Sequence, residues 1–198
     1  MSSVPSLKAE TPIDVDVDDA ELIDRSRNQP EVFSGIYERH ARRLRGYVAR
    51  RLGPDAADDI VSETFLIAFR RRGDYDLTRE DAGPWLFGIA VRLVGDHWRS
   101  EIRMHRAFAR SGFEPLVTDA LDERVADAVT AKAQGPRLAT ALATLSERDR
   151  EPLLLRTWGG MSCKEIADVL DIPVGTVRSR VHRARGTLRA ALGSSFAV

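Results

Sequence analysis

Apolar residues recur at three- and four-residue steps along most of the chain, which is the period of an amphipathic α-helix. In the first half of the chain, this pattern predicts three helices with turn residues between them. They cover about residues 31–52, 55–72 and 84–106. Gly53-Pro54 ends the first of them. No segment alternates between apolar and polar residues as a half-buried strand would, so we expect an all-α fold.

The second half of the chain shows shorter helices with clearer local signals. Ser146 can cap one helix, and a pair of glycines stops it. Ser162 and Glu165 have the spacing of a capping box, which marks the start of the next helix. A final helix is predicted over about 173–192. Short helices with separate start and stop signals indicate a small domain of their own.

The even overall charge, 30 basic against 30 acidic residues, conceals a regional pattern. Residues 1–30 carry 3 basic and 7 acidic groups with little to bury, which predicts an acidic mobile tail. Residues 112–136 carry 2 basic and 5 acidic groups and are predicted to be a flexible acidic linker, with a short helix over 119–133 as the alternative. We therefore expect two small helical domains, at 31–111 and 137–198.

Composition excludes several classes of protein. No apolar run reaches the roughly 18 residues that a membrane span needs. The acidic N-terminus lacks the apolar core of a secretory signal. Cys163 is the only cysteine, which excludes an internal disulfide and a multi-cysteine metal site. We expect a soluble, cytoplasmic protein.

The clearest functional pattern is a pair of short helices over 162–190. Val177 and Val181 lie four residues apart and can anchor the second helix on the first, which is typical of a helix-turn-helix. From Ile172 to the end, the chain carries five arginines, one histidine and no acid. Such side chains suit phosphates and guanine edges in the major groove of DNA. The alternative is a solvated, arginine-rich face on a structural helix.

Three segments, in this order along the chain, resemble bacterial sigma factors of the sigma-70 superfamily. They are DDIVSETFLIAFRRR, PWLFGIAVRLVGDHWR and LSERDREPLLLRTWGGMSCKEIADVLDIPVGTVRSRVHRARGTLRAAL. The first two are similar to the N-terminal core domain of that family, and the third to its promoter-binding C-terminal domain. Because no middle domain lies between them, the resemblance is to the compact extracytoplasmic-function (ECF) group. It covers about residues 31–111 and 137–192.

The resemblance implies an alternative sigma factor, which is a subunit rather than an enzyme. Such a protein binds core RNA polymerase and directs promoter recognition and transcription initiation. Its N-terminal domain reads the −10 element, and its C-terminal domain reads the −35 element as duplex. The implied partners are core RNA polymerase, promoter DNA and an anti-sigma factor. No cofactor, metal or membrane is implied.

The resemblance also assigns candidate residues to each surface. On the helix over 55–72, the residues implied to contact polymerase are Asp59, Ser62, Glu63 and Leu66. On the helix over 84–106, those implied to contact the −10 element are Arg92, Asp96, Trp98, Arg99 and Arg103. On the last helix, those implied to contact the −35 element are Thr176, Arg178, Ser179, His182 and Arg183.

Each assignment has an alternative. The acidic face of the 55–72 helix could be an ordinary solvated surface, and Trp98 could belong to the core instead of stacking on a base. The whole chain could be a helix-turn-helix transcription regulator that acts without polymerase docking. A sensing domain upstream would support that alternative, but residues 31–111 predict only helices. Asp58-Asp59 has no fixed partner for catalysis, and His40 is expected to be structural.

Overall fold

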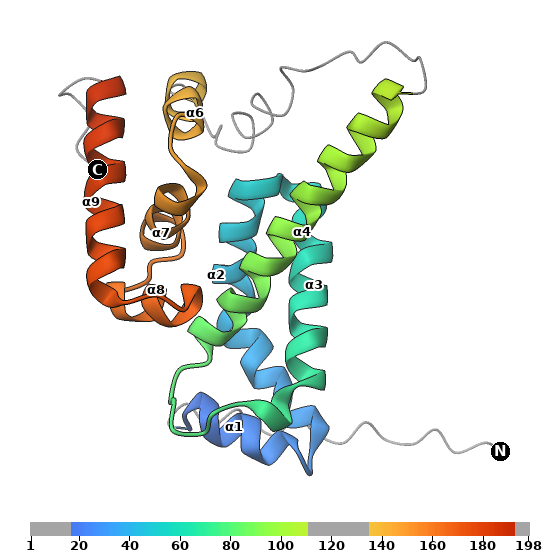
Figure 1. The fold of residues 1–198 in the computed structure, drawn as a ribbon. Coiled ribbons are helices and arrows are strands. Elements are labelled where there is room, and N and C mark those ends of the chain that lie inside the picture. The colour runs from blue at the N-terminus through green and yellow to red at the C-terminus, as the bar shows by residue number, and fades with distance from the viewer. Residues whose placement is uncertain (1–16, 111–134, 193–198) are drawn as a thin grey trace.

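The computed structural model describes residues 17–110 and 135–192, which form helices and no strand (Figure 1). The N-terminal domain contains α1 (Asp19–Ser26), η1 (Pro30–Phe33), α2 (Ser34–Leu52), α3 (Pro54–Arg70), η2 (Arg72–Asp74) and α4 (Gly83–Arg110). The C-terminal domain contains α6 (Gly135–Ala143), α7 (Glu147–Thr157), α8 (Cys163–Leu170) and α9 (Val174–Leu192). The predicted all-α fold with two helical domains is confirmed for these ranges. Most of the predicted linker, with its alternative helix over 119–133, lies outside them.

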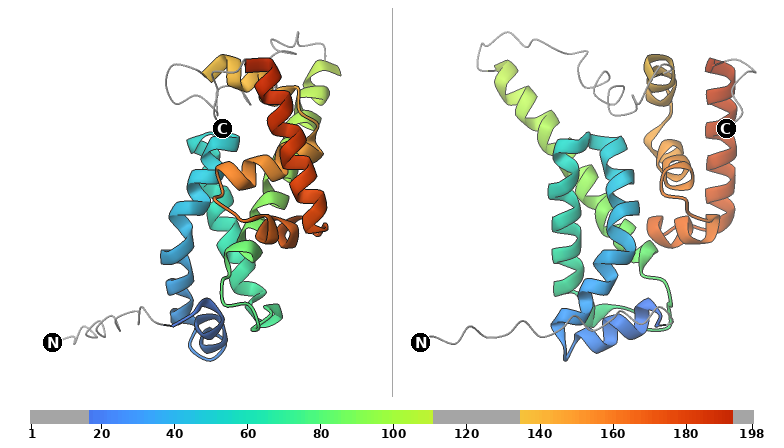
Figure 2. Two further views of the ribbon diagram at one scale, coloured as in Figure 1. Left: turned by 90° about the vertical axis from the view of Figure 1, so that its left-hand side faces the viewer. Right: turned by 180° about the vertical axis from the view of Figure 1, so that it is seen from behind.

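In the N-terminal domain, α2 and α3 lie side by side and α4 crosses them (Figures 1 and 2). The turn between α2 and α3 needs a glycine, because Gly53 has φ 84°, a conformation that residues with a Cβ rarely adopt. Pro54 then occupies the first helical position, where its missing N–H costs no hydrogen bond. Large side chains fill the space between the three helices. Fully buried members of this core are Ile36, Leu44, Tyr47, Val48, Leu86 and Phe87.

The prediction of a mobile tail over residues 1–30 is wrong for its second half. Residues 19–26 form α1, which packs across the end of the bundle and buries Leu22 and Ile23 (Figure 1). Two of the acids that suggested a solvated tail, Asp18 and Asp19, have structural roles. The carboxylate of Asp18 caps α1 by accepting the N–H of Glu21 at 2.8 Å. The N-terminal domain therefore begins before residue 31; residues 1–16 lie outside the described ranges.

The C-terminal domain follows its local signals closely. Ser146 caps α7, and Ser162 and Glu165 form the predicted capping box at the start of α8. Asp171 ends α8 in the left-handed conformation at φ 52°. Each cap satisfies backbone groups that a helix end would otherwise leave unpaired. The domain's core is aliphatic, and its fully or almost fully buried members include Leu153, Leu155, Met161, Ile166 and Val177.

Candidate nucleic-acid and polymerase interface

The helix-turn-helix predicted from the sequence is present in α8 and α9. Ile166 on α8 and Val177 on α9 are fully buried, and Val181 is 6% exposed. The turn between the helices is closed by the N–H of Ile172, which donates to the carbonyl oxygen of Ala167 at 3.1 Å. The two valines are therefore buried as expected, and the opposite side of α9 is left to solvent.

The exposed side of α9 carries the residues predicted to contact the −35 element. Thr176 is half-buried, and its carbonyl oxygen accepts a hydrogen bond from the Ser179 hydroxyl at 2.9 Å. Because Thr176 lies in the first turn of α9, this bond fixes the Ser179 side chain close to the start of the helix. The four exposed members are Arg178, Ser179, His182 and Arg183.

Arg183 has a partner that the sequence analysis did not identify. Its guanidinium donates two hydrogen bonds to the carboxylate of Asp149 on α7, at 2.8 and 2.9 Å. The hydrogen bond from Arg183 holds the pKa of Asp149 below its ordinary value. The Arg183 side chain is nevertheless 61% exposed, so one face of it remains available to a ligand. An acid 34 residues away gives no local signal of this contact.

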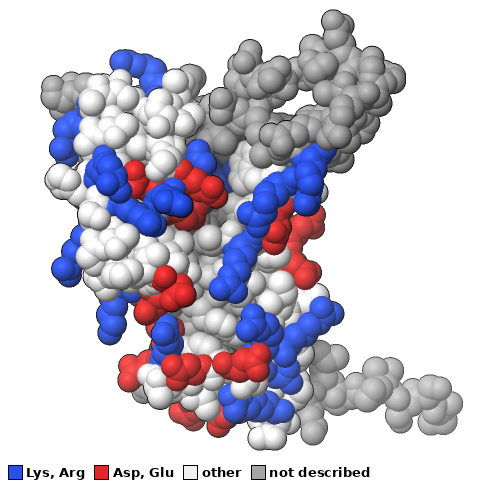
Figure 3. Space-filling view, in the orientation of Figure 1, with Lys and Arg blue, Asp and Glu red and all other residues white. Residues whose placement is uncertain are grey.

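The residues predicted to contact the −10 element lie along α4. Arg92, Asp96, Arg99 and Arg103 are exposed, and Figure 3 shows a line of basic side chains along this helix. Arg99 donates to Asp96 at 2.7 Å, which orients its guanidinium along the helix. Trp98 is half-buried and packs against the hydrophobic core, so only part of its side chain is accessible. The structure thus places all five on one helix, with Trp98 belonging partly to the core.

The face of α3 assigned to polymerase is exposed in the structure. Asp59, Ser62 and Glu63 are all exposed, and Leu66, which completes the set, is 41% exposed. The opposite face of α3 is buried. Tyr37 on α2 is 51% exposed, and its ring contacts that of Phe65 at 4.8 Å between centroids. Tyr37 belongs to the apolar pattern of its helix beside Ile36, which is typical of the core and gives no signal of this exposure.

A cleft of about 660 Å³ lies between the two domains and was not expected from the sequence. One wall is formed by side chains of α2 and α4, and the other by side chains of α6, α7, α8 and α9. Basic and aromatic side chains form most of the N-terminal wall, whereas on the C-terminal wall they alternate with leucines and two glutamates. Its lining includes Arg50, Arg92, Trp98 and Arg99 on the N-terminal side and Arg148, Trp158 and Arg180 on the C-terminal side. Three of the residues predicted to contact the −10 element therefore face the C-terminal domain.

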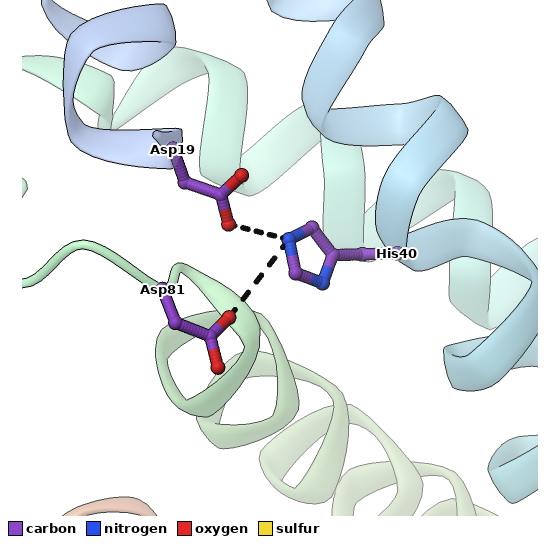
Figure 4. A group of neighbouring side chains, drawn as sticks. All are labelled: Asp19, His40 and Asp81. Carbon is purple, nitrogen blue, oxygen red and sulfur yellow. Dashed lines mark hydrogen bonds and ion pairs between the residues drawn. The ribbon is translucent and has the colours of Figure 1, made fainter. Parts of the chain in front are cut away.

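A polar cluster joins α1, α2 and the start of α4 (Figure 4). The ligand atoms of Asp19, His40 and Asp81 lie within 4.8 Å of one another, as they would around a metal ion. Protein groups already satisfy the buried carboxylate, however. Asp19 accepts hydrogen bonds from Arg39 at 3.0 Å, from His40 Nε2 at 2.6 Å and from the N–H of Ala82 at 2.9 Å. Burial alone would raise the pKa of Asp19, but the hydrogen bonds from His40 and Ala82 lower it. His40 is structural, as predicted.

Comparison with known proteins assigns a family to this arrangement. A family model described as sigma-70 region 2 matches residues 36–104, and one described as sigma-70, region 4 matches residues 136–188. The sigma factor NccH of Alcaligenes xylosoxydans xylosoxydans is 31% identical, over 92% of this chain and 98% of its own. The ECF sigma factor BldN of Streptomyces coelicolor is also 31% identical, and this chain spans 63% of its length. The chain belongs to the ECF group of the sigma-70 family.

Solved structures of similar proteins extend the likeness to the whole fold. A structure of CnrH in complex with the cytosolic domain of CnrY matches with a TM-score of 0.64 and 26% identity, over 90% of this sigma factor and 99% of CnrH. The sigma factor RpoE of Bartonella quintana, in complex with the anti-sigma factor NepR, matches with a TM-score of 0.57 and 22% identity, over 87% of this chain and 99% of RpoE. Among the described residues, no helix of this sigma factor is long and apolar enough to cross a membrane.

Proposed function

We propose that this ECF sigma factor binds core RNA polymerase and directs it to promoters through separate surfaces on its two domains. The observation that carries the proposal is the pairing, in one chain, of sigma-70 region 2 with region 4. Each region presents an exposed helix face whose chemistry suits a different ligand. Such a protein is a transcription initiation factor, and the polymerase supplies the catalysis.

Polymerase docking is assigned to the exposed face of α3. A leucine that is 41% exposed beside two carboxylates offers an apolar contact surrounded by charge, which is the composition of a specific protein interface. The residues in this role are Asp59, Ser62, Glu63 and Leu66. They face away from the core that α2, α3 and α4 share, so binding there leaves the domain's packing intact.

Promoter contacts are assigned to α4 and α9. Along α4, Arg92, Arg99 and Arg103 can neutralise phosphates of the −10 strand, and the accessible part of the Trp98 side chain can contact an unstacked base. Asp96 orients Arg99 in this scheme. On α9, the exposed arginines and polar residues enter the major groove at the −35 element. That set comprises Thr176, Arg178, Ser179, His182 and Arg183.

An anti-sigma factor is the third partner in this proposal. RpoE of Bartonella quintana was solved in complex with the anti-sigma factor NepR, and this chain shares the fold of RpoE. A helix-turn-helix regulator without polymerase docking is disfavoured. The domain upstream of the helix-turn-helix matches sigma-70 region 2 over residues 36–104, where such a regulator would carry a sensing domain.

The deciding experiment is competition for core RNA polymerase. The full chain should displace another sigma factor from core polymerase, whereas a regulator without docking should not. The double variant Asp59→Arg/Glu63→Arg should lose most of its ability to displace the other sigma factor. Its circular dichroism spectrum should stay that of the wild type. Asp74→Arg, which reverses an exposed carboxylate of the same domain outside the α3 face, is the matched control. Normal competition by the double variant would show that the docking face is assigned wrongly.

A further inference from the structure

The two domains are joined by an ion pair between α2 and α7. The carboxylate of Glu151 accepts hydrogen bonds from the Arg51 guanidinium at 2.7 and 2.8 Å. It also accepts one from the Tyr47 hydroxyl at 2.5 Å, and Arg51 in turn donates to that hydroxyl at 2.8 Å. The Arg51 and Glu151 side chains are each only 13% exposed. These three residues, the interdomain cluster, bring together positions 100 residues apart in the chain.

Further contacts continue the same interface on both sides of the interdomain cluster. The guanidinium of Arg43 donates to the carbonyl oxygen of Gly159 at 2.7 Å, and Arg79 forms an ion pair with Asp168 at 3.4 Å. Gly159 is itself buried against the N-terminal domain. A Cβ there would lie 2.6 Å from the carbonyl oxygen of Leu155 in its own domain and 3.2 Å from the ring of Phe87, so the position has no room for a side chain. The domains are thus held by specific, partly buried contacts.

Because the interdomain cluster is largely buried, each of its polar groups depends on the others for its hydrogen bonds. Desolvation is the main cause of the raised pKa of the Tyr47 hydroxyl, which therefore stays protonated and donates to Glu151. Burial alone would lower the pKa of Arg51, but the charge of Glu151 and the hydrogen bonds that Arg51 donates to Glu151 and Tyr47 raise it above its ordinary value. Removing the charge of Glu151 would leave a nearly buried guanidinium uncompensated, which is strongly unfavourable. The closed arrangement of the domains should therefore depend on this carboxylate.

The closed arrangement is incompatible with simultaneous contact to both promoter elements. Positions −35 and −10 lie about 25 base pairs apart, which is about 85 Å of duplex at roughly 3.4 Å per base pair. In the structure, Arg92 and Trp98 on α4 line the same cleft of about 660 Å³ as Arg180 on α9. The two DNA-binding helices therefore share one small cleft, with the C-terminal domain covering part of the −10 surface.

We propose that the interdomain cluster of Tyr47, Arg51 and Glu151 holds this sigma factor in a self-inhibited closed form that must open before it can engage a promoter. The proposal rests on the proposed function for its DNA-binding step. The closed form lowers the apparent promoter affinity by the fraction of molecules that are open, so breaking the cluster should raise that affinity. The inhibition is intrinsic to the chain and requires no second protein.

The test uses the full chain with charge-altered interdomain clusters. Glu151→Gln, Arg51→Glu and Glu151→Arg should each increase the radius of gyration of the free protein in small-angle X-ray scattering. The double exchange Arg51→Glu/Glu151→Arg should restore the pair and the compact form. Glu21→Gln is the matched control, because Glu21 pairs with Arg25 within α1 and takes no part in the interdomain cluster. Circular dichroism melting identifies any variant that fails to fold. If a charge-reversal variant fails to fold, the near-isosteric Glu151→Gln takes its place in the test.

The functional measurement is binding to a 60-base-pair duplex in the presence of core polymerase, with a promoter located by transcript start mapping. The opened variants should bind it at least about fivefold more tightly than wild type, which is the lower end of ordinary coupling between sites. Unchanged scattering in all single variants, or opening without tighter binding, would overturn the proposal. If the wild type and all variants fail to bind core polymerase, the proposed function is wrong. The inhibitory role is then wrong too, even if the scattering shows that the variants open.

Discussion

The two domains differ in where the information for their fold lies. In the C-terminal domain, helix ends are set by neighbours in the sequence: Ser162 and Glu165 cap α8, and Asp171 ends it. In the N-terminal domain, α1 is attached by contacts across the chain, where Asp19 bonds to His40 and to Ala82. A domain built from local signals can be inferred from its sequence in detail, whereas one built from distant polar contacts cannot.

The largest effect on stability is expected from the helix that the sequence analysis missed. Ile23 on α1 is fully buried, so Ile23→Ala should lower the free energy of unfolding by about 2–5 kcal/mol through lost burial and the cavity left behind. Urea denaturation followed by circular dichroism measures this loss. Asp24→Ala, at an exposed position of the same helix, should change it by about 0.5 kcal/mol or less. If both variants changed the free energy of unfolding by the same small amount, α1 would not be a packed part of the domain.

An intermediate effect is expected from the buried carboxylate that anchors α1. Asp19→Asn weakens the contacts with His40 and Arg39 and should cost about 1–3 kcal/mol at neutral pH. Because the folded state lowers the pKa of Asp19, the stability that its charge contributes is present above about pH 4 and is lost as the pH falls through the lowered pKa. The difference between wild type and variant should therefore narrow in acid. A difference that is constant from pH 7 to pH 3 would argue against this charge as the anchor.

A smaller effect is expected where the C-terminal domain relies on a local cap. Ser162→Ala removes the acceptor for the N–H of Glu165 and should lower the free energy of unfolding by about 1 kcal/mol. Hydrogen exchange should show a loss of protection in α8 and unchanged protection in α2 and α3. Lys164→Ala, exposed in the same turn, should change nothing. If Ser162→Ala loosened α1 as well, the two domains would form a single cooperative unit and the contrast between them would be mistaken.

The same contrast explains which features could be predicted from the sequence. Helical periodicity and caps predicted the all-α fold, and Val177 and Val181 are buried as expected. Two contacts could not be found in this way, the Arg183–Asp149 pair and the Arg51–Glu151 pair. With 30 basic and 30 acidic residues in the chain, spacing alone cannot select one partner from so many. The cleft was missed for the same reason, because distant contacts bring its two walls together.

The smallest effect on stability is expected on the reading face of α9, where the largest effect on sequence preference should occur. The Arg183 side chain is 61% exposed and pairs with Asp149, and exposed ion pairs contribute little to stability. Arg183 and Ser179 lie four residues apart and share one face of the helix, beside the face of Arg178 and His182. Arg189 lies in the last turn of α9, beyond this surface.

Arg183→Ala should therefore leave the melting temperature nearly unchanged and weaken −35 binding roughly tenfold at one base position. Arg189→Ala should weaken all sequences equally or have no effect. Both variants are measured with core polymerase against a set of single-base changes in the −35 element. Asp149→Ala serves as the control for the ion pair, since it frees Arg183 without removing it. A uniform loss with Arg183→Ala, together with an altered preference with Arg189→Ala, would place the reading face one or two turns further along α9.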